Sequence, residues 1–366
     1  MRRERPGVPI EEIPSAPRPI EGVGTAIAAF IGVAEEGPFS PSFVRSPDEF
    51  ARRWPGDAAL AQAVRGYFDN GGSRAWIAPV ERLEPSIAGA AVEAMDRDVT
   101  LVAITADPAA PPEVIAAAAR AMSNRRALLL TEGPWADAQS AIAAMTADPA
   151  GAVGAEGPNI AVYWPRVRRA RGDGGVQDIS PLGPVAGMIA RIDATRGVSR
   201  APSGSDARLA GVIDPAARVS TEEAGMLNGM GVNVIRSFQG RGTAVWGART
   251  QSTDSEWKYV PVRRTALYLE ESLERGLSWV VFEPNAEPLW GAVRRLVTDF
   301  LLGLYREGAL LGTKPEQAFF VRCDRTTMTQ DDIDGGRLVC VVGVSLVRPA
   351  EFVILRVVVQ AATADG

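Results

Sequence analysis

Short apolar runs alternate with stretches of helical periodicity along the first two thirds of this chain. The apolar runs are typical of buried β-strands, and in the intervening stretches apolar residues recur every three or four positions, as in amphipathic helices. We expect strands at 25–33, 74–80, 99–104, 126–130 and 159–167, and helices at 46–54, 58–71, 112–122, 137–145 and 181–197. Strands joined by helices of this length predict right-handed crossovers and a mainly parallel sheet.

The remaining third follows a different order of elements. Residues 232–238 and 243–250, separated by a glycine-containing turn, predict a β-hairpin. A helix at 263–275, a strand at 278–283 and a long helix from a cap at Asn285 to about Glu307 follow. The long helix carries an apolar stripe on one face, formed by Leu289, Val293, Leu296, Phe300 and Leu304. Three β-branched runs, at 318–324, 337–347 and 351–360, predict final strands.

Both ends of the chain have the pattern of extended arms. Five prolines within residues 1–22 exclude a helix there, because proline lacks the backbone donor and fixes φ. This segment still carries apolar side chains at Val8, Ile10 and Ile13. The apolar run near the other end contains Phe352, Ile354, Arg356 and Val358. Such segments need a sheet edge to pair with, in the same chain or in another subunit.

The amino-acid composition favours a globular protein over membrane-spanning, secreted or nucleic-acid-coating classes. The chain has 366 residues, 46% hydrophobic and 23% charged, which suits two or three globular domains. We expect no membrane insertion, because no run approaches the ~18 apolar residues that a span needs, and no secretory signal, because no apolar run follows the first charges. The net charge of −5 argues against a protein that coats nucleic acid. A local basic run is interpreted as a solvated loop, with a partner contact as the alternative: Arg166, Arg168, Arg169 and Arg171.

Candidate chemistry is sparse. The chain contains no histidine, which removes the common triads and the usual imidazole acid and base. Cys323 and Cys340 have no metal-like spacing and are expected to be buried, reduced thiols. Ser255 and Lys258 match the S-x-x-K pattern of acyl-transfer enzymes, but the companion motifs are missing.

The other short motifs have structural interpretations. Asp332 and Asp334 lack the closing glutamate of a calcium loop, and Thr329 with Asp332 instead predicts a capping box before Gly335 and Gly336. The glycines fit turns and do not form a phosphate-binding loop. We therefore expect no catalytic residue, no cofactor and no metal.

Several separate segments, in the same order, resemble the contractile tail sheath proteins of bacteriophages, R-type bacteriocins and extracellular injection systems. They are PGVPIEEIPS (6–15), FDNGGSRAWIAPV (68–80), GRGTAVWGARTQSTDSEWKYVPVRR (240–264), FEPNAEPLW (282–290) and TMTQDDIDGGRL (327–338). The resemblance implies a multi-domain α/β fold, with a subtilisin-like parallel-sheet middle domain and an α+β C-terminal domain between extended strand arms. The implied divisions are 1–22 (N-terminal arm), 23–84 (small α/β unit), 85–256 (middle domain), 257–347 (C-terminal sheath domain) and 348–366 (C-terminal arm).

The resemblance also implies a function. Sheath subunits form stacked hexameric rings around an inner tube and contract to drive that tube through a target envelope. The family's arms exchange between subunits, which points to Val8, Ile10 and Ile13 at one end and to Phe352, Ile354, Arg356 and Val358 at the other. Arg294, Arg295 and Thr298 are the expected tube-facing residues.

The expected partners are other copies of the chain, the inner tube, the baseplate and the tail terminator or cap, without nucleic acid. Assembly is expected in the cytoplasm of the producing bacterium, as part of a phage tail or of a tail-like particle that some systems release. A histidine-independent serine hydrolase using Ser255 and Lys258 is the alternative.

Overall fold

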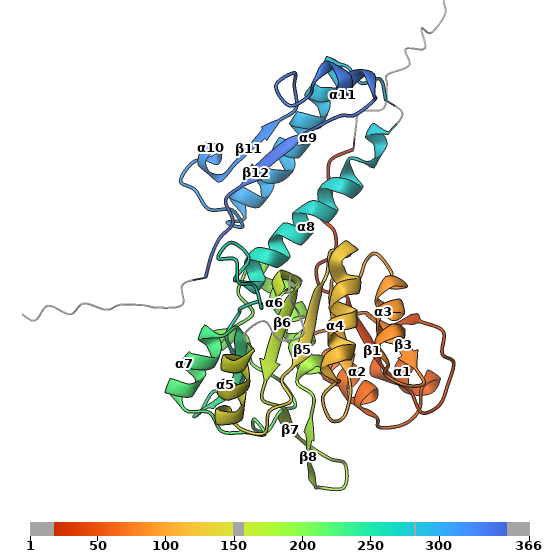
Figure 1. Ribbon diagram of the computed structural model, residues 1–366, viewed down its shortest axis with the longest axis vertical. Helices are drawn as coiled ribbons and strands as arrows, with labels where there is room; N and C mark the ends of the chain where they lie inside the picture. Colours follow the sequence, from red (N-terminus) through yellow and green to blue (C-terminus); the bar gives the residue numbers. More distant parts are fainter. Residues whose placement is uncertain (1–17, 149–156, 282, 350–366) are drawn as a thin grey trace, which may run out of the picture. The chain divides into compact units, whose positions relative to one another are not determined.

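The computed structural model describes residues 18–148, 157–281 and 283–349. Backbone contacts divide the chain into two compact units. The larger unit contains Val23–Glu271 and the described residues 346–349, and the smaller unit contains Ser272–Ser345 and the described residues 18–22. Each unit has a main sheet of its own (Figure 1).

An eight-stranded sheet forms the centre of the larger unit, in the order β10-β9-β6-β5-β4-β1-β3-β2. The six inner strands are parallel, while β10 and β2 run antiparallel to their neighbours at the two edges. The predicted α/β fold with a parallel-rich sheet is therefore confirmed. The strands are β1 (Ala28–Val33), β2 (Ser42–Val44), β3 (Ala75–Val80), β4 (Leu101–Thr105), β5 (Leu128–Glu132), β6 (Ile160–Trp164), β9 (Val232–Phe238) and β10 (Gly242–Trp246).

Helices cover both faces of this sheet. Successive strand residues point to opposite faces, so Phe30 of β1 joins one hydrophobic core and Ile31 joins the other. One face packs against α1 (Pro47–Arg53), α2 (Ala59–Asp69) and α6 (Leu182–Arg196). The other face packs against α3 (Pro85–Glu93), α4 (Pro112–Ala121), α5 (Ala138–Ala147) and α7 (Thr221–Gly229).

Short-range signals in the sequence set many of the helix ends. The Ser46 side chain caps α1 by accepting a hydrogen bond from the Glu49 amide. Capping boxes begin α5 at Asp137 and α7 at Ser220. Gly71 follows α2 with a φ of 111°, which glycine adopts without a steric penalty. Short 3₁₀ turns lie at Met122–Asn124 and Gly204–Asp206.

The basic run forms part of a hairpin, and not the loop that the sequence suggested. β7 (Val167–Ala170) pairs with β8 (Val176–Ile179), and Figure 1 shows this hairpin extending away from the main sheet. Each arginine lies beside a carboxylate, so the positive charge of the run is neutralised locally: Arg166 with Asp107, Arg168 with Asp178, Arg169 with Asp69 and Arg171 with Asp173.

The smaller unit combines one long helix with a two-stranded sheet. α8 (Val260–Gly276) contributes its last residues to this unit, and α9 (Glu287–Arg306) packs against β11 (Phe319–Arg322). β11 pairs antiparallel with β12 (Val341–Val344). The short helices α10 (Pro315–Ala318) and α11 (Gln330–Asp334) complete the unit. The buried face of α9 is formed by Leu289, Trp290, Val293, Val297, Leu301 and Leu304, so Leu296 and Phe300 of the predicted stripe lie at its margin.

Two predictions about this unit were wrong. The apolar run beginning at Ser278 forms a 3₁₀ turn, Ser278–Val280, and not a strand, because no described strand pairs with it. Asn285 does not cap α9, whose N-cap is Ala286. The Asn285 side chain instead accepts a hydrogen bond from the Trp290 indole and donates one to the Arg337 carbonyl.

The expected boundary near residue 84 falls inside one continuous sheet. β1, from the expected small unit, lies between β3 and β4, and β4 belongs to the expected middle domain. Local sequence patterns do not encode strand order, so they could not reveal that one sheet joins the two segments. The arm residues Val8, Ile10, Ile13, Phe352, Ile354, Arg356 and Val358 lie outside the described residues.

Candidate assembly surfaces

A buried ion pair fixes the first part of α8 within the larger unit. The Arg264 guanidinium donates to both carboxylate oxygens of Asp193 in α6, at 2.8 and 2.6 Å. The two side chains are only 4% and 3% exposed. Arg264 also donates to the Thr25 carbonyl at 2.6 Å, just before β1. Because both charges are desolvated and paired bidentately, the contact holds α8 in one position on α6.

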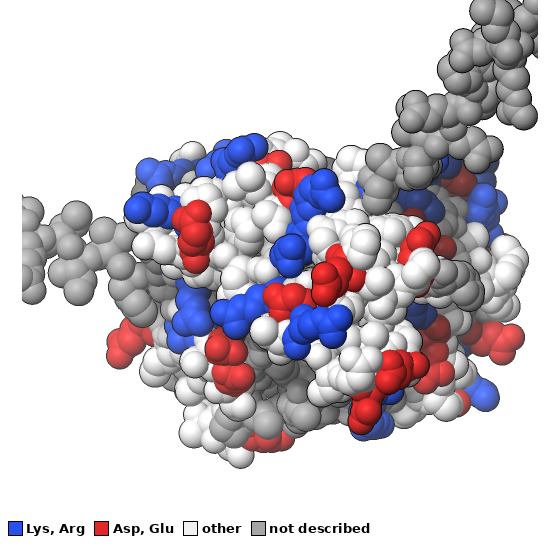
Figure 2. Space-filling view, turned by 90° about the horizontal axis from the view of Figure 1, so that it is seen from above, with Lys and Arg blue, Asp and Glu red and all other residues white. Residues whose placement is uncertain are grey.

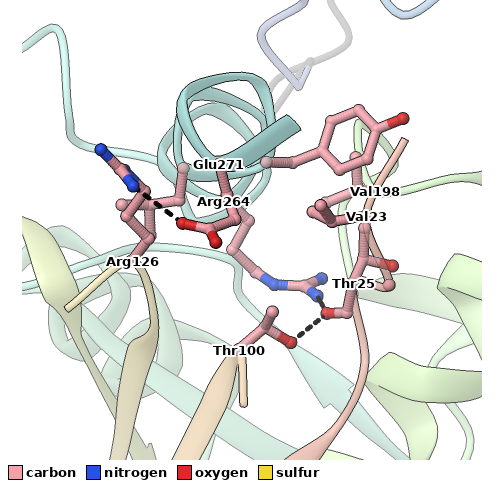
Figure 3. Close-up of a pocket in the computed structure, with 10 residues that line it drawn as sticks. Val23, Thr25, Thr100, Arg126, Val198, Arg264 and Glu271 are labelled. Atoms are coloured by element: carbon pink, nitrogen blue, oxygen red, sulfur yellow. Dashed lines mark hydrogen bonds and ion pairs between the residues drawn. The ribbon is translucent and has the colours of Figure 1, made fainter. Parts of the chain in front are cut away.

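A small cavity lies beside this pair (Figure 3). Glu271 of α8 receives hydrogen bonds from Arg126 at 2.8 Å and Arg97 at 3.3 Å, and Thr100 donates to the Thr25 carbonyl at 2.6 Å. The space available to water centres is about 20 Å³, which suits a single water molecule. The cavity is therefore part of the packing of α8 and has no room for a metabolite.

Ile20, near the start of the described residues, packs on the last turn of α8 in the smaller unit. Ile20 is buried. A Cβ on Gly276 would lie 2.7 Å from the Ile20 Cγ2 atom. The absence of a side chain at position 276 therefore lets the Ile20 side chain pack this close to the helix.

The predicted tube-facing residues lie on α9. Arg294 and Arg295 are exposed, and Thr298 is half-buried. The Arg294 guanidinium donates a 3.4 Å hydrogen bond to the Cys323 carbonyl within the smaller unit. Arg295 lies away from the buried face and is open to a partner.

The sheet of the smaller unit has only two strands among the described residues. Its exposed apolar side chains include Phe320 and Val341, at 48% and 42% exposure. A two-stranded sheet leaves backbone donors and acceptors along its outer edges without a strand neighbour. This surface has the properties of a site for an added strand.

The structure does not support a serine hydrolase that uses Ser255 and Lys258. Ser255 is exposed in a hydrogen-bonded turn. The Lys258 ammonium lies 5.5 Å from the Tyr259 ring centre. Within the described ranges, no hydrogen bond joins Ser255 to Lys258, so the lysine is not placed to activate the serine.

The acidic motif near residue 332 is a helix cap, as predicted. Thr329 and Asp332 form a capping box at α11, which ends at Gly335. Hydrogen bonds from Thr329 lower the pKa of Asp332 to about 2, with a further contribution from Arg337. The part of the chain that the structure describes holds no group of three or more cysteine, aspartate or glutamate side chains arranged for a metal.

One buried carboxylate was missed by the sequence analysis. Glu132 ends β5 and is almost fully buried, with its Oε2 atom 3.8 Å from the Arg166 Nε atom. Burial raises its pKa to about 7, against the opposing effect of Arg166. Its neighbours Asp107 and Arg166 follow β4 and β6, so only the parallel order of these strands could have revealed the cluster.

Charges of both signs are interspersed on the face shown in Figure 2. No helix among the described residues is long and apolar enough to cross a bilayer.

Residues 85–251 match the family model of the phage tail sheath protein central domain, and residues 252–360 match the phage tail sheath C-terminal domain. A chain of the anti-feeding prophage helical sheath in its contracted state is 31% identical, with a TM-score of 0.81, over 98% of this chain and 100% of that chain. This chain belongs to the phage tail sheath family. The resemblance that the sequence motifs suggested is thereby confirmed.

Two more solved structures are similar to this sheath family member. The sheath complex of the extracellular contractile injection system PVC, in its contracted state, is 30% identical with a TM-score of 0.82, over 98% of this chain and 99% of that chain. A chain in the six-fold symmetrised anti-feeding prophage baseplate is 31% identical with a TM-score of 0.78, over 98% and 100%. No curated protein sequence matches this chain significantly.

Proposed function

We propose that this chain is a structural subunit of a contractile sheath, which polymerises as stacked hexameric rings around an inner tube and shortens to drive that tube through a target envelope. The near-complete match to two contracted sheaths, at 30–31% identity, carries this proposal. The similarity to a baseplate-associated chain supports docking of the sheath on a baseplate. A tail terminator is the proposed partner at the other end.

Electron microscopy of the purified protein tests this function. Expressed alone, the chain should form hollow tubes with six-fold end views. Co-expressed with the tube protein of the same gene cluster, it should form longer and narrower particles that shorten when triggered. Dispersed monomers under both conditions would overturn the proposal.

The finer architecture is also a proposal. We assign the α/β unit to the subtilisin-like domain that the family resemblance implies, on the basis of its parallel sheet with helices on both faces. The segments 1–22 and 348–366 are the proposed exchanging arms. The buried Ile20 and the two-stranded sheet support this assignment, because they provide an anchored departure point and an acceptor for an added strand. Because such sheaths are parts of phage tails or tail-like particles, we also propose that the chain assembles in the cytoplasm of a producing bacterium.

The exposed face of α9 is the proposed contact with the inner tube. Arg295 is the best probe, because it is exposed and its replacement leaves the hydrogen bond of Arg294 intact. Arg295→Glu should still polymerise alone but should fail to assemble around the tube. Arg241→Glu, in the exposed turn between β9 and β10, is the matched control and should assemble normally. Normal loading of the tube by Arg295→Glu would place the contact elsewhere.

A further inference from the structure

The only two cysteines of the chain are brought together in the smaller unit. β11 and β12 pair in a register that ends with Arg322 opposite Val341. The next positions outward in this antiparallel ladder are Cys323 and Cys340. Directly opposed residues in such a ladder have Cα atoms about 4.5–5.5 Å apart, inside the range of about 4.4–6.8 Å that a disulfide requires.

The two strands stay close beyond the cysteines. Thr327 donates a hydrogen bond from its hydroxyl to the Val339 carbonyl at 2.8 Å. Both cysteines are free thiols, and they lie within hydrogen-bonding reach of each other. The register and the thiol–thiol hydrogen bond therefore place the two sulfurs next to each other.

The surroundings of the two thiols differ. Cys323 is buried, whereas Cys340 is half-buried and open to a small reagent. The hydrogen bond from the Cys323 thiol lowers the pKa of Cys340, and the Arg294 guanidinium favours its thiolate further. The same hydrogen bond and burial raise the pKa of Cys323. Cys340 thus has the character of an attacking thiolate, and Cys323 that of a resolving thiol.

We propose that Cys340 and Cys323 form a reversible redox site, which a small-molecule disulfide such as oxidised glutathione converts into an intrachain disulfide. The Cys340 thiolate attacks one sulfur of the small disulfide, forms a mixed disulfide and releases the first glutathione thiolate. The Cys323 thiol then loses its proton to solvent and attacks the Cys340 sulfur, releasing the second glutathione thiolate. The two protein thiols are oxidised, and one glutathione disulfide is reduced to two thiols.

Closure would link β11 covalently to β12 around the segment 324–339, which contains α11. The bond removes conformational freedom from the unfolded chain, so it raises the stability of this unit. A dithiol of this kind stays open in a reducing cytoplasm and closes in an oxidising medium.

Intact mass spectrometry of the full chain tests the site. The folded protein is incubated in glutathione buffers of graded ratio, quenched with an alkylating reagent and weighed. The wild type should lose two hydrogens and both alkylation sites while remaining a monomer on a non-reducing gel. Its Tm should rise on oxidation and return after reduction. Thiols that remain fully alkylated in excess oxidised glutathione would overturn the proposal, as would disulfide-linked dimers.

Two matched variants separate the roles of the cysteines. Cys323→Ser should accumulate a glutathione adduct on Cys340, because no resolving thiol remains. Cys340→Ser should stay unmodified while folded and become alkylated only after denaturation. Arg294→Gln should slow the alkylation of Cys340 several-fold. Equal adduct formation by the two single variants would contradict the assigned roles, even if the wild type forms the disulfide.

Discussion

At the residue scale, Glu132 is the side chain whose protonation the fold changes most clearly. Its pKa rises from 4.5 to about 7 on folding, chiefly because burial disfavours the carboxylate. The folded state therefore favours the protonated form, and this contribution to stability is lost as pH rises through 7. The loss amounts to roughly 3 kcal/mol, although Arg166 and Asp107 share the site.

Glu132→Gln should remove this pH dependence. The amide cannot ionise, so the variant should be more stable than the wild type above pH 7, by a margin that shrinks as the pH falls from 7 towards 4.5. Thermal unfolding between pH 5 and pH 9 provides the comparison. Glu36→Gln, at an exposed position, is the control and should follow the wild-type curve. A constant difference between Glu132→Gln and the wild type across this range would show that packing, and not ionisation, causes the effect.

The buried pair formed by Arg264 and Asp193 makes a second prediction at this scale. Asp193→Asn leaves the Arg264 charge buried without its carboxylate, at a cost of about 3–5 kcal/mol. Arg196 and Asp206 form an exposed pair of similar length, 2.9 Å, so Asp206→Asn should cost only about 0–1 kcal/mol. Denaturant unfolding of the two variants measures the contrast. Equal losses of unfolding free energy in the two variants would mean that burial does not determine how much an ion pair contributes to stability.

At the element scale, glycines in α6 set how closely it approaches α2. A Cβ added to Gly187 would lie 2.1 Å from the Tyr67 carbonyl oxygen, which belongs to the backbone and cannot rotate away. Gly187→Ala should therefore separate the helices and cost about 1–3 kcal/mol. Gly225→Ala in α7 meets nothing within 4 Å and should add up to about 1 kcal/mol of stability. Unfolding midpoints that fall by the same amount in both variants would contradict the close-packing argument.

Among the helices and strands, some features could be predicted from the sequence and others could not. The strands of the main sheet and the capping box at α11 show in short stretches of sequence, so local patterns identified them. The capping box at Ser220 and its helix α7 depend on equally local contacts but were not predicted. The interaction of Asn285 with Trp290 and Arg337 could not be found in this way, because Arg337 lies far along the chain. The apolar run at 278–281 resembles a strand, but a strand also needs a partner, which its own residues do not reveal. The contacts of Glu132 with Asp107 and Arg166 could not be predicted either, because they depend on which strands lie side by side in the sheet.

At the scale of the whole molecule, α8 contributes to both compact units. Its residues up to Glu271 belong to the α/β unit, and its residues from Ser272 belong to the smaller unit. Arg264 anchors the first part, while Gly276 contacts Ile20 in the second. Both of these anchoring contacts are made between described residues, so neither depends on residues 1–17.

Deletion of residues 1–17 tests the proposed exchange of the N-terminal arm between subunits and keeps Ile20 in place. The variant should unfold at the wild-type temperature, because the described packing does not use the deleted segment, but it should fail to polymerise. Replacing Val8, Ile10 and Ile13 by aspartate should have the same effect, since their apolar side chains are the proposed contacts with an acceptor sheet. Replacing Glu11 and Glu12 by alanine is the matched control and should leave polymerisation intact. Light scattering and electron microscopy report assembly, and sheaths of normal length from the deletion variant would refute the exchange of this arm.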